Sequence, residues 1–209
     1  MSIDAKKILE DLLASLDSLQ GIRPDEIPNI DLYMDQVTTF MDAELSSSKR
    51  YESDKILTKT MINNYAKNRL LPPPIKKKYS PEHMLLLIFI YYFKNILSIT
   101  DIQTLLSPIT ERYFNKDSGY SMEDLYAEVY SMEKTEIEQI KKELMTKYEK
   151  SGQIFGDAPT EDQSFLRLFS FVCILSFDIY VKKQMLEQIV DELASLQTGS
   201  DTKGGKKEK

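Results

Sequence analysis

The stretch from residue 60 to residue 106, TMINNYAKNRLLPPPIKKKYSPEHMLLLIFIYYFKNILSITDIQTLL, decides the fold. Its first part is apolar on one side only, and Thr58 is a favourable N-cap, so we predict a helix from Thr58 to about Leu70. Pro72–Pro74 end this helix, because proline has no backbone N–H and disfavours the helical conformation of the residue before it. Residues 75–79, IKKKY, then form a short extended or looping segment.

A strongly apolar helix follows this segment. Ser80–Glu82 is a favourable helix start, with a cap residue, a proline at the first helical position and an acid in the first turn. From Met84 to Phe93 the helix is apolar on every side, which predicts burial nearly all round. Ser98–Asp101 resembles a capping box and starts a short helix through Leu106, which Pro108 ends.

Amphipathic patterns on either side of this stretch predict four more helices. Their apolar residues recur three or four positions apart over residues 3–19, 32–45, 121–149 and 160–196. The last helix, of about 36 residues, would span roughly 54 Å at about 1.5 Å per residue, which is longer than a compact domain needs. Residues 198–209 are polar and glycine-bearing, which is typical of a disordered tail.

The composition favours the same fold class. The chain has 209 residues, 42% of apolar types, which is enough for a sizeable hydrophobic core. Only seven glycines and eight prolines are present, which disfavours a turn-rich β fold. We therefore predict an all-α protein.

One cysteine and one histidine limit the chemistry that the chain can support. Cys173 is the only cysteine, which excludes a disulfide within the chain and a four-cysteine zinc site. Cys173 lies in an apolar run and is predicted to be buried, and His83, in a first helical turn, is predicted to be structural. We predict no catalytic residue, no metal site and no cofactor, and expect that the protein is not an enzyme.

The sequence also predicts a soluble, cytoplasmic protein without a membrane partner. The N-terminal residues MSIDAKKILE have no apolar signal core. The longest uncharged apolar run, Met84–Phe93, is too short to span a bilayer.

Charge is distributed unevenly along the chain, whose net charge is −6. Of its 27 basic residues, seven lie between positions 55 and 79 without any acidic residue, which leaves 20 against 33 acidic residues elsewhere. A lysine-rich, solvated face is one explanation. The other is a phosphate-binding surface on an otherwise acidic protein, and we favour it. The seven residues are Lys55, Lys59, Lys67, Arg69, Lys76, Lys77 and Lys78.

The predicted helix after Thr58 has the residue types of a DNA recognition helix. Met61, Ile62, Tyr65 and Leu70 form its inward side, which leaves an outward arc of amides, a hydroxyl and cations. Asparagine pairs bidentately with adenine edges in the major groove, and lysine contacts guanine or phosphate. The predicted DNA-binding residues are Lys59, Thr60, Asn63, Asn64, Lys67, Arg69, Lys76, Lys77 and Lys78.

In register, residues 60–106 resemble the winged helix-turn-helix of the MerR regulators. The shared pattern is an aromatic residue in the recognition helix, a Leu-Leu-Pro-Pro boundary, a basic wing and a Tyr-Ser-x-Glu helix start. An apolar helix and a Ser-Ile-x-x-Ile-x-x-Leu-Leu helix follow. The matching positions are Tyr65, Leu70, Leu71, Pro72, Pro73, Tyr79, Ser80, Glu82, Leu86, Phe89, Ile90, Ser98, Ile99, Ile102, Leu105 and Leu106.

Two further segments, IDLYMDQVTTFMDAEL and LTKTMINNYAKN, resemble the YkrK-like family of Gram-positive bacteria. That resemblance extends over most of the chain from Pro28 onward and implies presumed DNA binding. Two features of the sequence differ from the MerR pattern. About 12 residues, 46–57, separate the first two helices of the motif, and Met61 or Ile62 replaces the arginine usual early in the recognition helix.

Together these observations predict a transcriptional regulator that binds double-stranded DNA. Residues 1–27 form an N-terminal amphipathic helix and residues 28–110 the MerR-like DNA-binding domain. Residues 111–197 form a helical C-terminal part for dimerisation or sensing of a small-molecule effector of unknown identity, and 198–209 is the tail. The alternative is a helical protein-interaction adaptor that does not bind DNA. The acidic net charge and the missing recognition-helix arginine favour that alternative.

The predicted regulator is a homodimer held by its long C-terminal helix. In a monomer, the apolar stripe of this helix would remain in water at a cost of about 25 cal/mol per Å². The competing explanation is that residues 3–19 fold back and cover the stripe within one chain. The stripe consists of Phe165, Leu168, Phe169, Val172, Leu175, Leu186, Val190 and Leu193.

Overall fold

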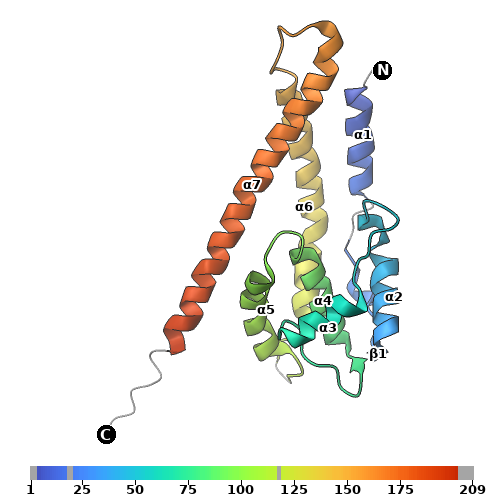
Figure 1. Ribbon diagram of the computed structural model, residues 1–209, viewed down its shortest axis with the longest axis vertical. Coiled ribbons are helices and arrows are strands. Elements are labelled where there is room, and N and C mark those ends of the chain that lie inside the picture. The colour runs from blue at the N-terminus through green and yellow to red at the C-terminus, as the bar shows by residue number, and fades with distance from the viewer. Residues whose placement is uncertain (1–3, 18–20, 117–118, 202–209) are drawn as a thin grey trace. The chain divides into compact units, whose positions relative to one another are not determined.

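The computed structural model describes residues 4–17, 21–116 and 119–201. The chain is mostly helical, with 71% of its residues in helices and 3% in strands, so the predicted all-α class is confirmed (Figure 1). Its elements are α1 (Ala5–Leu16), η1 (Pro24–Glu26), β1 (Leu32–Tyr33), α2 (Met34–Glu44), η2 (Ser46–Ser48), α3 (Lys59–Lys67), β2 (Lys78–Tyr79), α4 (Pro81–Phe93), α5 (Ile99–Tyr113), α6 (Met122–Ser151) and α7 (Thr160–Asp201). Of the predicted tail, 198–201 continue α7, and 202–209 lie outside the described residues.

Two compact units divide the chain. Unit 1 consists of Met1–Gly21 and Val129–Lys182, and unit 2 consists of Ile22–Glu128 and Lys183–Lys209. Helices α6 and α7 each contribute one part to each unit.

Helix α4 is the centre of unit 2. Every residue from His83 to Tyr91 is buried, as the all-round apolar sequence predicts, but Tyr92 is exposed and Phe93 half-buried at the end of the run. Ser80 is the N-cap and Pro81 the first helical residue, so the predicted helix start is also confirmed. His83 is 1% exposed, and its Nδ1 accepts a hydrogen bond from the Ser80 backbone N–H at 3.0 Å. Burial holds the pKa of His83 below its usual value.

The first two residues of the helix predicted over 32–45 instead form β1, one strand of a two-stranded sheet. Leu32 and Tyr33 pair in antiparallel fashion with Tyr79 and Lys78, respectively. Helix α2 therefore begins at Met34. Strands of two residues leave no periodic pattern in the sequence, which is why the periodicity predicted only the helix.

The prediction that Pro108 ends its helix is wrong, because α5 continues to Tyr113 with Pro108 inside it. Proline lacks the N–H that would bond the carbonyl four residues earlier, which is the Thr104 carbonyl. That carbonyl accepts a hydrogen bond from Gln197 Nε2 at 3.1 Å, within unit 2. A side chain distant in the sequence thus replaces the missing backbone donor and lets the helix continue.

Unit 1 joins α1 to the hairpin of α6 and α7. Its buried core consists of Ala5 and Leu9 from α1, Tyr148 from α6 and Phe171 from α7. The partly buried side chains of Leu13, Leu144, Leu168 and Leu175 pack against this core. Leu168 and Leu175, predicted for the dimer interface, therefore belong to a core within one chain, and α1 covers that side of α7.

The opposite side of α7 is exposed and apolar. Cys173 is exposed, so its predicted burial is wrong, because it lies two positions, or about 200°, from the buried Phe171 around the helix. By length and composition one described helix, Thr160–Gln197, could cross a membrane: its most apolar window has a mean hydropathy of 1.7 and is 11% buried. One such helix is weak evidence for a membrane location.

Candidate nucleic-acid interface

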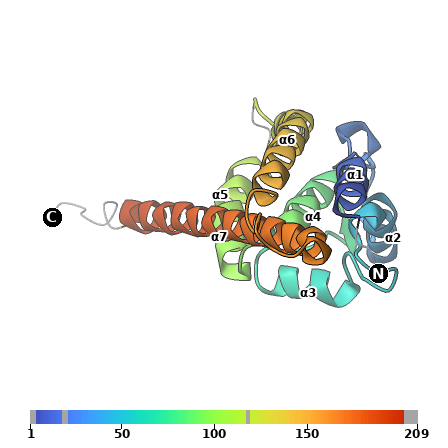
Figure 2. The ribbon, with the colours of Figure 1, turned by 90° about the horizontal axis from the view of Figure 1, so that it is seen from above.

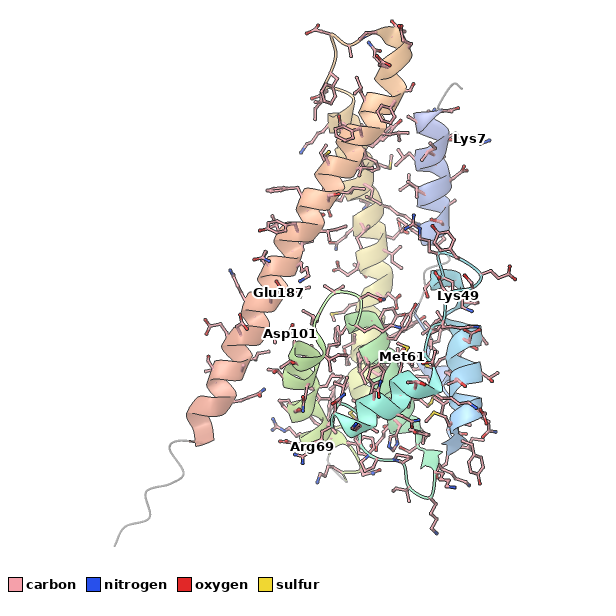
Figure 3. The ribbon with its side chains drawn as sticks, in the orientation of Figure 1. Lys7, Lys49, Met61, Arg69, Asp101 and Glu187 are labelled. Atoms are coloured by element: carbon pink, nitrogen blue, oxygen red, sulfur yellow. The ribbon has the colours of Figure 1, made fainter. Side chains whose placement is uncertain are left out.

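Helix α3 begins as the sequence predicts and ends earlier. Thr58 Oγ1 accepts a hydrogen bond from the Met61 N–H at 3.1 Å, so Thr58 is the N-cap. The last helical residue is Lys67, not Leu70. Figure 3 labels Met61 in the first turn of α3 and Arg69 just beyond its end.

A Schellman motif explains the early end of α3. The Leu70 N–H donates to the Tyr65 carbonyl at 2.9 Å, and the Arg69 N–H donates to the Ala66 carbonyl at 3.2 Å. Arg69 has a φ of 57°, a left-handed conformation in which glycine is usual. Leu70 and Tyr65 are both buried, which is the apolar contact that often accompanies this motif. Arg69 is consequently exposed on a turn rather than on the helix.

The two sides of α3 differ sharply. Ile62 and Tyr65 are buried, and burial raises the pKa of the Tyr65 hydroxyl. Met61 is half-buried. Helix α3 lies at the edge of unit 2, with α4 and α5 on its inner side (Figure 2). The predicted outward arc is exposed throughout: Lys59, Thr60, Asn63, Asn64 and Lys67.

The outward arc keeps most of its polar groups free. Within the described part of the chain, the amides of Asn63 and Asn64 and the ammonium of Lys67 have no hydrogen-bond or ion-pair partner. Lys59 is the exception, because its ammonium pairs with the Asp35 carboxylate of α2. Both side chains are largely exposed, so this ion pair contributes little and a phosphate can replace the carboxylate.

The predicted basic segment 75–79 is a tight β-hairpin. The Lys78 N–H donates to the Ile75 carbonyl at 2.9 Å, and the Ile75 N–H donates to the Lys78 carbonyl at 3.1 Å. The two residues between them, Lys76 and Lys77, have φ values of 51° and 65°. A two-residue loop with positive φ at both positions is typical of a type I′ turn, in which Asn-Gly is the favoured pair.

The three lysines of this hairpin differ in their surroundings. Lys76 and Lys77 are exposed at the tip and, among the described residues, have no partner. Lys78 is half-buried in β2, and its ammonium lies 5.3 Å from the centre of the Tyr33 ring in β1. The hairpin therefore presents two free charges at its tip and a third beside the sheet.

One comparison with known proteins gives a match. A family model described as a domain of unknown function, DUF1836, matches residues 22–130, just over half of the chain. The chain belongs to the DUF1836 family. No curated protein and no solved structure matches it. The DUF1836 segment begins at the first residue of unit 2. It ends two residues beyond Glu128, the last residue of the first chain segment in that unit. The resemblances to the MerR and YkrK-like families stay predictions.

Within the DUF1836 segment, the long connection 46–57 between α2 and α3 is held in place. Ile56 and Leu57 are 3% and 5% exposed. The Lys94 ammonium donates to the Ile56 carbonyl at 2.6 Å, and burial lowers the pKa of Lys94. At the other end of the connection, the hydroxyl groups of Ser48 and Tyr91 form a hydrogen bond. These contacts to α4 and its C-cap fix the entry into α3 despite the length of the connection.

Two contributors to this surface come from outside the basic segment. Tyr33 lies beside Lys78, and Asp35 pairs with Lys59. Both precede the basic residues by more than twenty positions, and only the strand pairing and the packing of α2 on α3 bring them there. The absence of local acidic residues in the sequence therefore does not describe the charge of the folded surface around Lys59.

Proposed function

We propose that this DUF1836 protein is a DNA-binding transcriptional regulator with a MerR-like winged helix-turn-helix in unit 2. Helix α2 is the first helix of the motif, α3 lies in the major groove, and the hairpin 75–79 is the wing that contacts phosphates. The protein acts through binding alone and is not an enzyme. We expect the protein to act in the cytoplasm.

The hairpin tip is the observation that carries the proposal. Lys76 and Lys77 occupy left-handed conformations that cost a residue with a side chain on the order of 1 kcal/mol or more each. Asparagine followed by glycine would form the same turn without this cost. Two adjacent, exposed and unpaired lysines at strained positions indicate that their charge is used. A polyanion such as DNA is the partner that this charge fits.

The outward arc of α3 supports base contacts beside the wing. Asn63 and Asn64 present free amides, which can pair with the N6 and N7 atoms of adenine. Thr60 can contact a base or a phosphate, and Lys67 and Arg69, near the end of the helix, can contact phosphates. No acidic side chain belongs to α3 itself.

Binding to a random-sequence DNA duplex over a salt series tests the proposal. Six cations, Lys59, Lys67, Arg69 and Lys76–Lys78, belong to the surface. If all of them meet phosphates, log K falls with log salt with a slope of about −5, at about −0.9 per contact. Fluorescence anisotropy measures this slope. A protein without measurable binding at about 50 mM salt would refute the proposal.

A charge-matched control is available on unit 1. Lys7 and Lys142 are exposed, and the ammonium group of neither has a partner among the described residues. Changing both to Gln removes two positive charges from the chain without touching α3 or the wing. The slope should then stay at its native value, whereas loss of two wing lysines should reduce it.

A protein-interaction adaptor is the second candidate. The net charge of −6 favours it, as does the pairing of Lys59 with Asp35, which removes one free cation from the surface. The absence of arginine from α3 points the same way. The salt series separates the two candidates, because an adaptor has no affinity for random DNA even at low ionic strength.

We further propose that the regulator is a homodimer held by the exposed side of α7. Leu168 and Leu175 already pack within unit 1, so the interface consists of the aromatic and aliphatic residues on the other side. Large exposed apolar patches mark interaction surfaces. In the unit 1 part of α7 the large exposed apolar residues have exposed fractions between 39% and 69%: Phe165, Phe169, Val172, Phe177, Ile179, Tyr180 and Val181.

A second copy fits this surface better than a bilayer does. The helix face beside it carries Arg167, which stacks on Tyr148, and Asp178, which pairs with Lys147 at 2.6 Å. That face is committed to α6, so only one side of α7 is available, whereas a helix that crosses a bilayer alone exposes all its sides to lipid. A two-fold pair of α7 helices also provides the two recognition helices that a palindromic site requires.

A further inference from the structure

A cleft of about 650 Å³ opens at the end of unit 1, where α1 begins, α6 ends and α7 begins. This volume lies within the range of small-molecule sites in proteins. Its walls combine the rings of Tyr148 and Phe155 with polar groups of Ser164 and Arg167. All the residues that line the cleft belong to unit 1, and none of them belongs to α3 or the wing.

Arg167 is a cation without an anionic partner among the described residues. Its guanidinium carbon lies 3.9 Å from the centre of the Tyr148 ring, and its Nη2 donates to the Tyr148 carbonyl at 3.3 Å. Its Nε is buried and, in the described part of the chain, has no hydrogen-bond partner. A guanidinium has five N–H donors, so most of the hydrogen-bonding capacity of Arg167 is unused. An unpaired, partly buried charge is costly unless an anion completes it.

Gly152 makes room for the guanidinium. A Cβ atom at this position would lie 3.1 Å from both Cζ and Nε of Arg167. The backbone of Gly152 does not require glycine, since no glycine among the described residues has a positive φ. The close approach of the Arg167 side chain therefore explains the glycine. The chain keeps space for a cation that has no counter-charge of its own.

Phe155 supplies a second sign of a binding site. It lines the cleft, is 46% exposed and has a φ of 63°, a left-handed conformation that is unfavourable for an aromatic residue. Residues held in strained backbone conformations cluster at active sites and ligand-binding sites. Asp4 and Lys6 also line the cleft. Asp4 accepts a hydrogen bond from the Lys7 N–H at 3.0 Å as the N-cap of α1, so its carboxylate is already used.

We propose that this cleft binds a small organic anion. The carboxylate or phosphate of the ligand receives hydrogen bonds from Arg167 and Ser164, and its apolar part packs against Phe155 and Tyr148. Planar, forked donors such as guanidinium bind both kinds of anion bidentately. The proposal does not depend on DNA binding by unit 2, and its test contains no DNA.

Calorimetric titration of the full chain with four probes tests the proposal. Benzoate and phenyl phosphate carry both a ring and an anion, benzyl alcohol carries only the ring, and inorganic phosphate carries only the anion. We expect one or both of the first two to bind at least about tenfold more tightly than the last two, a difference of about 1.4 kcal/mol. Whichever of the two binds more tightly identifies the ligand as a carboxylate or a phosphate.

Arg167→Gln should remove that preference, and Arg167→Lys should retain part of it, because lysine keeps the charge without the fork. Circular dichroism shows whether the variants fold. The native protein provides a readout without substitution, since the NMR signal of the Arg167 Nε–H should shift on addition of the tighter probe. The proposal is overturned if benzyl alcohol binds as tightly as benzoate and phenyl phosphate. It is equally overturned if the Nε–H signal does not move at saturation.

Discussion

Replacing Lys76 with Asn and Lys77 with Gly should stabilise the protein and weaken its binding to DNA at the same time. Both residues have positive φ values, and their neighbours Ile75 and Lys78 exchange two backbone hydrogen bonds. Asn-Gly is the preferred sequence for this type I′ turn. Because a left-handed conformation costs an ordinary residue about 1 kcal/mol or more, the double change should raise the free energy of unfolding by about 1–2 kcal/mol.

The same double change removes two positive charges from the tip of the wing. If each lysine meets one phosphate, the slope of log K against log salt should become less steep by about 1.8, at about 0.9 per contact. The loss should be equal for specific and random DNA, since phosphate contacts carry no sequence information. Urea denaturation followed by circular dichroism measures the stability, and anisotropy over a salt series measures the slope.

The double Ala variant of Lys76 and Lys77 separates the two effects. It removes the same charges but keeps a Cβ at both positions, so it should reproduce the weaker salt dependence without the gain in stability. Two results would refute the reasoning. An unchanged salt slope in both variants shows that the wing does not contact phosphates, and a loss of stability in the Asn-Gly variant shows that the turn is not type I′.

Three further predictions concern specificity, assembly and pH. Asn63→Ala or Asn64→Ala should cost about 1–3 kcal/mol on the cognate site and little on random DNA, measured by competition anisotropy; equal losses on both would make these backbone contacts. Sedimentation equilibrium should give a mass of about twice the chain mass of 24.2 kDa, and the mass of one chain when Phe169 and Val172 are both changed to Glu. If the native protein has the mass of one chain at all concentrations, the dimer is ruled out. Burial lowers the pKa of His83 in the folded protein. As pH falls below about 6.5, the unfolded chain therefore takes up a proton at His83 before the folded chain does. The free energy of unfolding should then drop by up to about 1.4 kcal/mol per pH unit. His83→Gln keeps an acceptor for the Ser80 N–H and should flatten this dependence in urea titrations at several pH values, whereas identical pH profiles would contradict it.

The parts of the fold that follow from local sequence were predictable. Thr58 and Ser80 begin their helices, because capping depends on residues within one turn. The burial of α4 on all sides follows from its run of uncharged, apolar residues, which leaves the helix without a polar side. The outward arc of α3 also follows from periodicity, since one face of an amphipathic helix has to be exposed.

The parts that depend on distant contacts were not predictable. Pro108 was expected to end a helix, and only the Gln197 side chain, about ninety residues away, supplies the donor that lets α5 continue. Cys173 was expected to be buried, because its neighbours are apolar, but α7 is apolar on two sides and packs on one. For the candidate interface, the charge pattern predicted the cations, whereas the Asp35 partner of Lys59 and the turn that exposes Arg69 required the fold.

The boundary of the DUF1836 match gives these separate surfaces a common explanation. The match covers residues 22–130, and the first and longer segment of unit 2 covers residues 22–128. That part contains α3, the wing and the contacts of Lys94 that hold the connection before α3. The cleft at Arg167 and the exposed side of α7 in unit 1 lie outside the match.

A family model describes the positions that its members share. We therefore expect DUF1836 proteins to share α3 and the hairpin 75–79, and to differ in the helices that form the cleft and the exposed side of α7. Transfer of residues 22–130 alone would not test this division, because α7 also contributes Gln197 to unit 2. Arg167→Gln in the full chain does test it: the variant should lose the organic anion and keep the native salt slope on random DNA. A change in that slope would show that the two surfaces do not work separately.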